Sequence, residues 1–237
     1  MDKINPFKVR EYCKVPAKKI INRKTSLEKK ANKSHNLRIL TPLFGTLVFV
    51  CLYVIATFYY PGGSQADKNA KGFSWTQNYW CNLLNENAIN GQQNPARPIA
   101  ITAMFVLCLT FAIFCFIFPR YTGLPKKSLI AIQISGIHSM ATGMFLFTNL
   151  HDIIINVASL FGFVAIAGIF AGLRKLKWRK LFWLGIFNLA LVALNNILYY
   201  GNGLRVYLPV VQKITFLFFL LWMCLTDIQL FSKINSK

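Results

Sequence analysis

Residues 128–173 read SLIAIQISGIHSMATGMFLFTNLHDIIINVASLFGFVAIAGIFAGL, and this stretch decides the fold class. Two apolar runs, 128–148 and 153–173, are joined by the short segment Asn-Leu-His-Asp at 149–152. At ~1.5 Å per residue, a helix of about 20 residues crosses the ~30 Å hydrocarbon core of a bilayer. The stretch therefore predicts two membrane-spanning helices that meet at a tight turn.

Apolar runs of the same kind recur along the rest of the chain. Hydrophobic residues make up 55% of the chain and charged residues 14%, whereas soluble domains carry about 25% charged residues. We therefore predict an all-α, polytopic membrane helix bundle with six transmembrane helices. The predicted helices cover residues 39–58, 98–118, 128–148, 153–173, 181–200 and 207–227. The predicted domains are a basic tail (1–38), a transmembrane domain (39–227) with a long outer loop (59–97), and a short tail (228–237).

The distribution of lysine and arginine predicts the orientation. The segments that six helices place on one side of the membrane hold 22 Lys and Arg residues, 12 of them in residues 1–38, and the other side holds four. Short loops rich in Lys and Arg stay in the cytoplasm. We therefore expect a multi-pass protein of the cell membrane with both termini cytoplasmic, and this orientation accounts for the net charge of +20.

The basic tail also indicates partners. Near an anionic bilayer surface each Lys or Arg contributes ~1 kcal/mol of attraction, so we expect residues 1–38 to bind anionic lipid headgroups. Nucleic-acid binding is not expected, because the tail has few aromatic residues and no recognisable binding fold. The sequence does not predict an oligomeric state.

The long outer loop has an aromatic cluster formed by Trp75, Tyr79 and Trp80. Tyrosine and tryptophan settle at the headgroup level of a membrane. Ser74 and Gln77 have the spacing of a capping box. Together they predict a short helix over about 75–90 that lies in the membrane interface.

The same loop carries a resemblance to a known family. The segments concerned are Tyr60-Pro61-Gly62-Gly63, Phe73-Ser74-Trp75, Asn78-Tyr79-Trp80-Cys81 and Asn94-Pro95, together with His138 in the third predicted span. With six spans and cytoplasmic ends, they resemble the bacterial membrane family known as domain of unknown function 998, which is similar in layout to the damage-regulated autophagy modulator family. The resemblance covers about residues 40–230, implies the same layout, and brings no catalytic residues.

Polar residues inside the spans need a partner or a role, because polar groups in hydrocarbon are unfavourable. His138 shares a helix face with Ser135 and Thr142, so it is either a neutral histidine bonded across a helix interface or a group that handles protons or ligand. Asn188, Asn195 and Tyr199 form a polar stripe, which indicates hydrogen bonds between helices or a cavity that holds ligand.

The outer halves of the last four spans predict a polar, outward-facing pocket. Its candidate ligand-binding residues, with His138 deeper in the membrane, are His138, His151, Asp152, Asn195, Tyr199, Gln212 and Lys213. Within it, Asp152 either caps its helix or pairs with Lys213, which otherwise extends toward water.

Small residues predict close helix packing, either within the chain or between two copies. Gly168 and Gly172 lie on one face of the fourth span, and Ser139 and Gly143 have the matching spacing on the third.

Several chemistries are excluded by the sequence. It has no glycine-rich phosphate loop and no Gly-x-Ser-x-Gly elbow. His138 and His151 would lie ~20 Å apart along the helix axis, too far to share a metal ion, so we expect no metal and no cofactor. We expect a non-enzymatic protein that binds or passes a small or lipid-like ligand, or acts as a membrane scaffold. The alternative is a membrane-embedded, lipid-active enzyme that uses His138 or His151 with Asp152.

Overall fold

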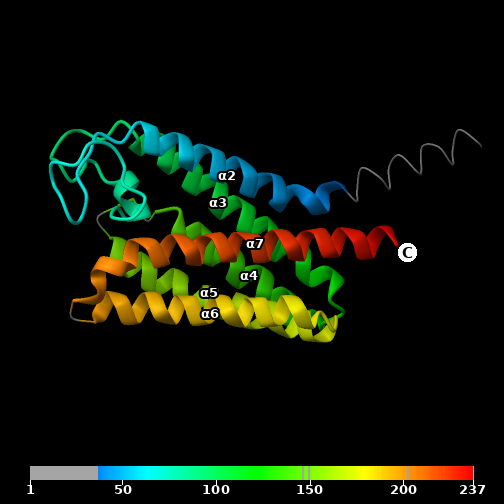
Figure 1. Cartoon of the computed structure of the whole chain (residues 1–237). Helices are drawn as coiled ribbons and strands as arrows, with labels where there is room; N and C mark the ends of the chain where they lie inside the picture. Colours follow the sequence, from blue (N-terminus) through cyan, green and yellow to red (C-terminus); the bar gives the residue numbers. More distant parts are fainter. Residues whose placement is uncertain (1–36, 146, 149, 202, 237) are drawn as a thin grey trace, which may run out of the picture. The chain divides into compact units, whose positions relative to one another are not determined.

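The computed structural model describes residues 37–145, 147–148, 150–201 and 203–236. Within these residues it is all-helical and has no strand, which confirms the all-α part of the predicted fold class (Figure 1). The predicted basic tail lies almost entirely outside the described residues. The long helices are α2 (Thr41–Phe58), α3 (Arg97–Ile117), α4 (Lys126–Gly143), α5 (His151–Lys175), α6 (Arg179–Tyr200) and α7 (Leu208–Asn235). Short 3-10 helices are η1 (Arg38–Leu40), η2 (Trp80–Leu84), η3 (Phe118–Tyr121) and η4 (Leu204–Tyr207).

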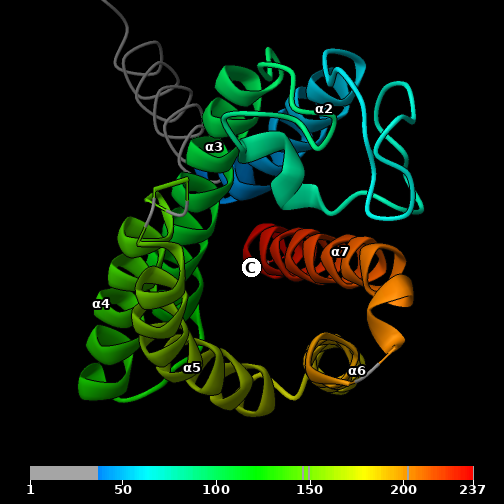
Figure 2. The same cartoon turned by 90° about the vertical axis from the view of Figure 1, so that its left-hand side faces the viewer.

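Successive long helices run in alternate directions within the compact unit Ile39–Lys237 (Figures 1 and 2). The outer loop and the connections before α5 and α7 lie at one end, which we call the loop end. The connections before α4 and α6 lie at the opposite end, which we call the basic end because both are rich in Lys and Arg. The largest contacts join α2 to α3, α3 to α4, α4 to α5, and α6 to α7, while α7 also packs on α2.

Small residues let neighbouring helices approach closely. A Cβ added to Gly168 of α5 would lie 2.2 Å from Cγ1 of Ile132 on α4. A Cβ added to Gly136 of α4 would lie 2.4 Å from Cβ of Cys115 on α3. Since real side chains do not approach to these distances, both contacts depend on glycine. The predicted face with Gly168 and Gly172 therefore packs within the chain, but against Ile132, Thr122 and Phe118 and not against the predicted Ser139 and Gly143.

Five helical segments in the described part of the chain are long and apolar enough to cross a membrane. They are Arg38–Phe58, Arg97–Tyr121, Ile153–Lys175, Arg179–Tyr200 and Leu204–Asn235. The remaining helix, α4, is not among them, because its 18 residues include Lys126, Lys127, Gln133 and His138, which lower its mean hydropathy. It also ends at Gly143, before the predicted end at Thr148, whereas α7 continues to Asn235, past the predicted end at Asp227.

The outer loop folds into a compact cap, residues 59–96, held by buried asparagines. The Asn94 side-chain amide donates to the carbonyl groups of Asn82, Leu83 and Asn85 at 3.3, 3.1 and 2.9 Å. Asn78 donates to the Gly63 carbonyl group at 2.8 Å. Burial raises the pKa of the Tyr60 phenol, although the hydrogen bond that the phenol accepts from the Ile89 backbone opposes that shift. The loop is therefore an ordered part of the fold.

The predicted surface helix over 75–90 is wrong. The described residues of that segment form turns and the short η2 helix. Ser74 does not cap a helix with Gln77; instead the Gln77 side-chain oxygen accepts a hydrogen bond from Ser64 at 3.0 Å. Asparagine and serine side chains bind nearby backbone groups and so compete with helix formation.

The three aromatic residues predicted at the interface have different environments. Trp75 is exposed and Tyr79 is half-buried. Trp80 is directed into the bundle, where its ring centroid lies 4.4 Å from that of Tyr53 on α2 and 5.9 Å from that of Phe216 on α7. Trp80 thus connects the cap to α2 and α7.

Candidate functional site

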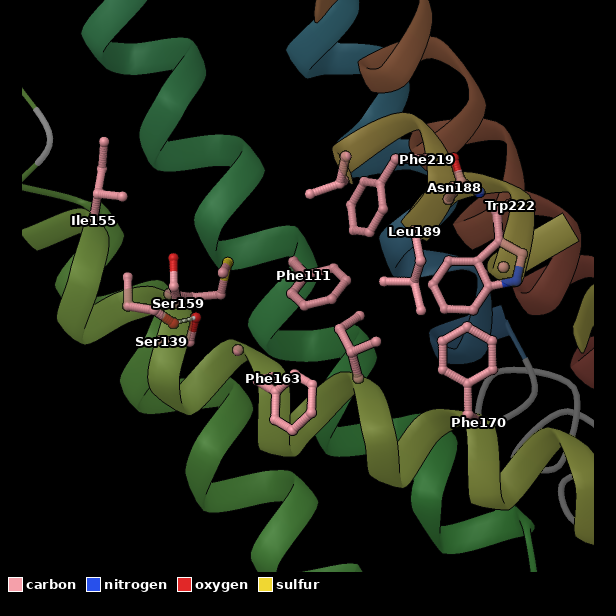
Figure 3. Close-up of a pocket in the computed structure, with 16 residues that line it drawn as sticks. Phe111, Ser139, Ile155, Ser159, Phe163, Phe170, Asn188, Leu189, Phe219 and Trp222 are labelled. Carbon is pink, nitrogen blue, oxygen red and sulfur yellow. Dashed lines mark hydrogen bonds between the residues drawn. The ribbon is translucent and has the colours of Figure 1, made fainter. Parts of the chain in front are cut away.

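A cavity of about 450 Å³ lies among α3, α4, α5, α6 and α7 (Figure 3). Most of its lining is aromatic or aliphatic, and none of its lining residues carries a charge. Figure 3 shows Ile155 and Ser159 toward one end and Phe170 and Trp222 toward the other. The lining residues are Phe111, Ser139, Met140, Ile155, Ala158, Ser159, Gly162, Phe163, Ile166, Phe170, Gly185, Asn188, Leu189, Val192, Phe219 and Trp222.

Aromatic packing forms the end of the cavity near Trp222. The Trp222 ring nitrogen donates to the Leu181 carbonyl group at 2.8 Å, which fixes the indole against α6. The Phe170 ring stacks on Trp222 with centroids 6.0 Å apart. A Cβ added to Gly185 would lie 2.8 Å from Phe170 and 3.2 Å from Trp222, so glycine is required for both rings to pack there.

The polar lining residues are mostly occupied by helix contacts. The Ser139 hydroxyl of α4 donates to the Ala158 carbonyl group of α5 at 2.7 Å. The Asn188 amide nitrogen of α6 donates to the carbonyl groups of Leu184 at 3.0 Å and Phe218 at 3.4 Å, and its buried oxygen has no partner among the described residues. Ser159 differs, because it is exposed and its hydroxyl makes no hydrogen bond with the described residues.

The cavity opens on the outer surface of the bundle between α5 and α6. Phe163 of α5 is 76% exposed, and Leu189 and Val192 of α6 are 45% and 47% exposed. These apolar side chains belong to helices that are apolar enough to span a membrane. A hydrocarbon chain can therefore enter from the side without crossing a polar surface.

The predicted outer pocket does not coincide with this cavity. Among the five candidate residues whose side chains are described, none lines it. The helix α5 begins at His151 and Asp152 follows, but their side chains lie outside the described part of the structure. A ligand-binding role for these seven residues stays a prediction.

The histidine in α4 is bonded to its own helix. One ring nitrogen of His138 lies 2.9 Å from the Ile134 carbonyl oxygen, and the ring packs 5.6 Å from Phe161. The Thr142 hydroxyl donates to the His138 backbone carbonyl group rather than to the ring. Nucleophilic catalysis needs a serine or cysteine that is hydrogen-bonded to a base such as this imidazole. Within the described residues no serine or cysteine forms that hydrogen bond with His138. No group of three possible metal ligands occurs there either.

The polar stripe of α6 forms hydrogen bonds between helices. Asn195 donates to the Thr215 hydroxyl of α7 at 2.6 Å, and Asn188 reaches the same helix through Phe218. Tyr199 is exposed, and its backbone carbonyl group accepts a hydrogen bond from Arg205 at 2.8 Å. Both asparagines of the stripe therefore form the predicted interhelical hydrogen bonds, and Asn188 also lines the cavity, so for Asn188 a contact with ligand stays open.

The structure brings Gln212 and Lys213 together with the cap. The Gln212 side-chain oxygen accepts the Trp80 backbone N–H at 3.1 Å. The Lys213 ammonium donates to the carbonyl groups of Asn78 and Pro209 and lies 5.5 Å from the Phe73 ring centroid. Backbone carbonyl groups thus bind the Lys213 ammonium group. One of the two alternatives from the sequence was an ion pair between Lys213 and Asp152.

Comparison with known proteins adds no identification. No family model matches this chain, and no curated protein or solved structure does. The resemblance to domain of unknown function 998 stays a hypothesis that rests on the loop residues and the predicted layout.

Proposed function

We propose that this chain is a six-span protein of the cell membrane, with both termini cytoplasmic, that binds a lipid-like molecule in the cavity without chemically altering it. The observation that carries the proposal is the uncharged, apolar cavity of about 450 Å³ with its opening among exposed apolar side chains of α5 and α6. Binding sites for small molecules have volumes of about 300–1,000 Å³ and mostly apolar walls.

The alternation of the helices supports six spans. The helix α4 runs beside α3 and α5, and it connects the basic end of α3 to the loop end of α5. Three of its polar side chains face other helices: Ser135 and Ser139 are buried, and Gln133 donates to the Phe116 carbonyl group of α3 at 2.7 Å. His138 is exposed and lies within hydrogen-bonding distance of the Ile134 carbonyl oxygen of its own helix. Such contacts make a polar helix compatible with a membrane.

The charges support the proposed orientation and a second lipid contact. Arg120, Arg174, Lys175, Lys177 and Lys180 lie at the basic end and are exposed. Cytoplasmic leaflets carry a negative surface potential that attracts such residues. The 12 Lys and Arg residues of segment 1–38 would add to this attraction, so anionic headgroups are the proposed partners on that side.

Photolabelling tests cavity binding. The full chain is reconstituted in vesicles that contain a lipid with a photoreactive diazirine near the end of its chain, and labelled peptides are identified by mass spectrometry. We expect label on α5 within 158–166 and on α6 within 189–192 at several times the yield on Leu47, Val48 and Val50 of α2, which are also exposed.

A matched pair of variants separates cavity binding from general contact with lipid. Val192→Trp fills the mouth of the cavity, whereas Val48→Trp adds the same bulk to a valine of α2 with nearly the same exposure, 48% against 47%. We expect Val192→Trp alone to abolish the excess label. Equal label on α2 and the cavity helices, unchanged in Val192→Trp, would contradict the proposal.

A further inference from the structure

Polar side chains gather at the loop-end side of the cavity mouth. Ser159 lines the cavity, and Asn156 lies three residues before it, on the same side of α5. Both residues are exposed, and neither side chain makes a hydrogen bond with the described residues. Since α5 is apolar enough to span a membrane, two polar side chains on its surface that have no partner among the described residues are suited to bind polar groups of a ligand.

On the α6 side of the cavity mouth there is also an exposed polar side chain, Asn196. Asn196 follows the lining residue Val192 by one helical turn toward the loop end. Its amide nitrogen donates to the Val192 carbonyl group at 2.9 Å, which leaves the amide oxygen as an acceptor. Along their own helices, Asn156 and Ser159 lie ~7 to 12 Å from the start of α5, and Asn196 lies ~6 Å from the end of α6; we call these three side chains the polar band.

The polar band is uncharged, and the nearby cations are engaged elsewhere. Arg205 donates to the Tyr199 carbonyl group and packs on the Tyr199 ring, and Lys213 is held by carbonyl groups of the cap and of its own helix. The mouth is therefore suited to a neutral polar head.

From these groups we infer the ligand class: a neutral amphipathic lipid, with one hydrocarbon chain in the cavity and a head that carries hydroxyl or amide groups at Ser159, Asn156 and Asn196. This inference rests on the proposed function and adds the chemistry of the ligand. Hydroxyl and amide groups donate to and accept from serine and asparagine side chains at once. A carboxylate or a phosphate without a remaining P–OH group cannot donate to these acceptors.

The volume and length of the cavity fit one chain. A water molecule occupies about 30 Å³ in the liquid, and a methylene group is of similar size. The cavity of about 450 Å³ thus holds on the order of fifteen methylene groups. From Ser159 to Phe170 the α5 wall extends ~16 Å, so the head stays at the loop-end mouth while the tail reaches Phe170 and Trp222.

Competition for the photolabelled site tests the ligand class. The full chain, labelled as above in vesicles of zwitterionic lipid, is challenged with a monoacylglycerol, a fatty acid and a primary alkylamine of equal chain length. We expect the monoacylglycerol to displace the label at about one tenth of the concentration that the two charged compounds need, the effect of roughly 1.4 kcal/mol.

The Ser159 hydroxyl provides the matched variant. Ser159→Ala should raise the monoacylglycerol concentration needed about fivefold, the effect of losing one hydrogen bond, and leave the fatty acid unchanged. Ser232→Ala, at an exposed serine near the end of α7, is the control and should change neither.

The outcomes separate the ligand class from cavity binding itself. If all three compounds compete equally, or the fatty acid or amine competes best, the ligand class is wrong while cavity binding stands. If Ser159→Ala leaves the monoacylglycerol curve unchanged, the assigned head position is wrong. If no compound displaces the label and Val192→Trp has no effect, cavity binding fails as well.

Discussion

Lys213 shows how one residue can connect a spanning helix to the cap. It lies in α7, where an ammonium group without partners would be unfavourable in hydrocarbon. Two backbone carbonyl groups, one from its own helix at Pro209 and one from the cap at Asn78, accept hydrogen bonds from it. The adjacent Gln212 holds the Trp80 backbone. Neighbouring residues of α7 therefore fix the same part of the cap.

Removal of the Lys213 charge should loosen the cap rather than unfold the bundle. In Lys213→Met we expect amide hydrogen exchange over residues 73–84 to become faster, by an amount that corresponds to ~1.5 to 3 kcal/mol for a hydrogen bond to a charged group. Exchange in α4 and α5 should not change. Lys233→Met, a lysine near the opposite end of α7, is the control, and an unchanged cap in Lys213→Met would rule out the connection.

The same residue decides between two sequence-based alternatives. If carbonyl groups alone hold Lys213, the stability losses of Lys213→Met and Asp152→Asn should add within ~0.3 to 0.5 kcal/mol, as expected for independent sites. We expect this additive result from thermal unfolding of the two single variants and the double variant in detergent. Recovery of part of the loss in the double variant would instead indicate the ion pair predicted from sequence.

Residue types alone predicted that Lys213 and Gln212 matter, but not their partners. The partners lie more than 130 positions away, in a loop whose path is set by asparagine side chains. Trp80 was predicted at the membrane interface because of its type, yet it packs inward on Tyr53 and Phe216. A side chain's type indicates the environment that it tolerates, and the tertiary fold selects which one it has.

Among the helices, the pair α4 and α5 depends most on close approach. Gly168 contacts Ile132, and the Ser139 hydroxyl bonds the Ala158 backbone. Both contacts lie in the interface between α4 and α5. Ser139 of α4 and Ala158 and Gly162 of α5, which also belong to this interface, line the cavity. A change in this interface should therefore affect both stability and the shape of the cavity.

Gly168→Ala should destabilise the bundle. The added methyl group meets Ile132 at a distance that no side chain tolerates, and overpacking of this kind costs about 1–3 kcal/mol. Thermal unfolding in detergent should show the loss, and Ile132→Ala in the same chain should restore part of it by making room. Ala167→Leu, at the exposed neighbouring position, should have little effect; full stability in Gly168→Ala would mean that the helices do not approach this closely.

Hydrophobic runs predicted all six long helices, because each run is long and bounded by polar or glycine-rich segments. The boundaries were less accurate where polar residues occur within a run. The helix α4 ends at Gly143, and the following residues turn, with Phe145 and Thr148 donating to the carbonyl groups of Thr142 and Phe145. The cavity could not be predicted, since it depends on which faces of α5 and α6 are left without a neighbour.

At the scale of the whole molecule, the alternation of helices and the distribution of charge lead to the same orientation. The described lysines and arginines of the connections before α4 and α6 lie at one end, and the cap lies at the other. Both patterns are consistent if α4 crosses the membrane. If it did not, α3 and α5 could not both span while running in the same direction, as they do in Figure 1.

Cysteine labelling in intact cells checks this orientation, and a native thiol serves as the reporter. Cys81 is exposed in the cap, so an impermeant maleimide should label it from outside, and Cys81→Ser should abolish that label. Although the residue is exposed as a whole, neighbouring atoms of the cap desolvate its sulfur, which raises the pKa of the Cys81 thiol. Because the thiolate is the reactive form, labelling should be faster at higher pH.

In the Cys81→Ser background, Thr148→Cys reports on α4 and Lys177→Cys on the basic end. Thr148 lies in the connection between α4 and α5, and Lys177 lies in the connection between α5 and α6. Six spans place Thr148 outside and Lys177 inside, so the first should be labelled in intact cells and the second only after the cells are made permeable. Label on Lys177→Cys in intact cells would invert the orientation, and protection of Thr148→Cys would mean that α4 does not cross. The connection before α5 lies at the same end of the bundle as the cap. If the cap is outside, Thr148 is therefore outside as well, and we expect neither of these contradicting results.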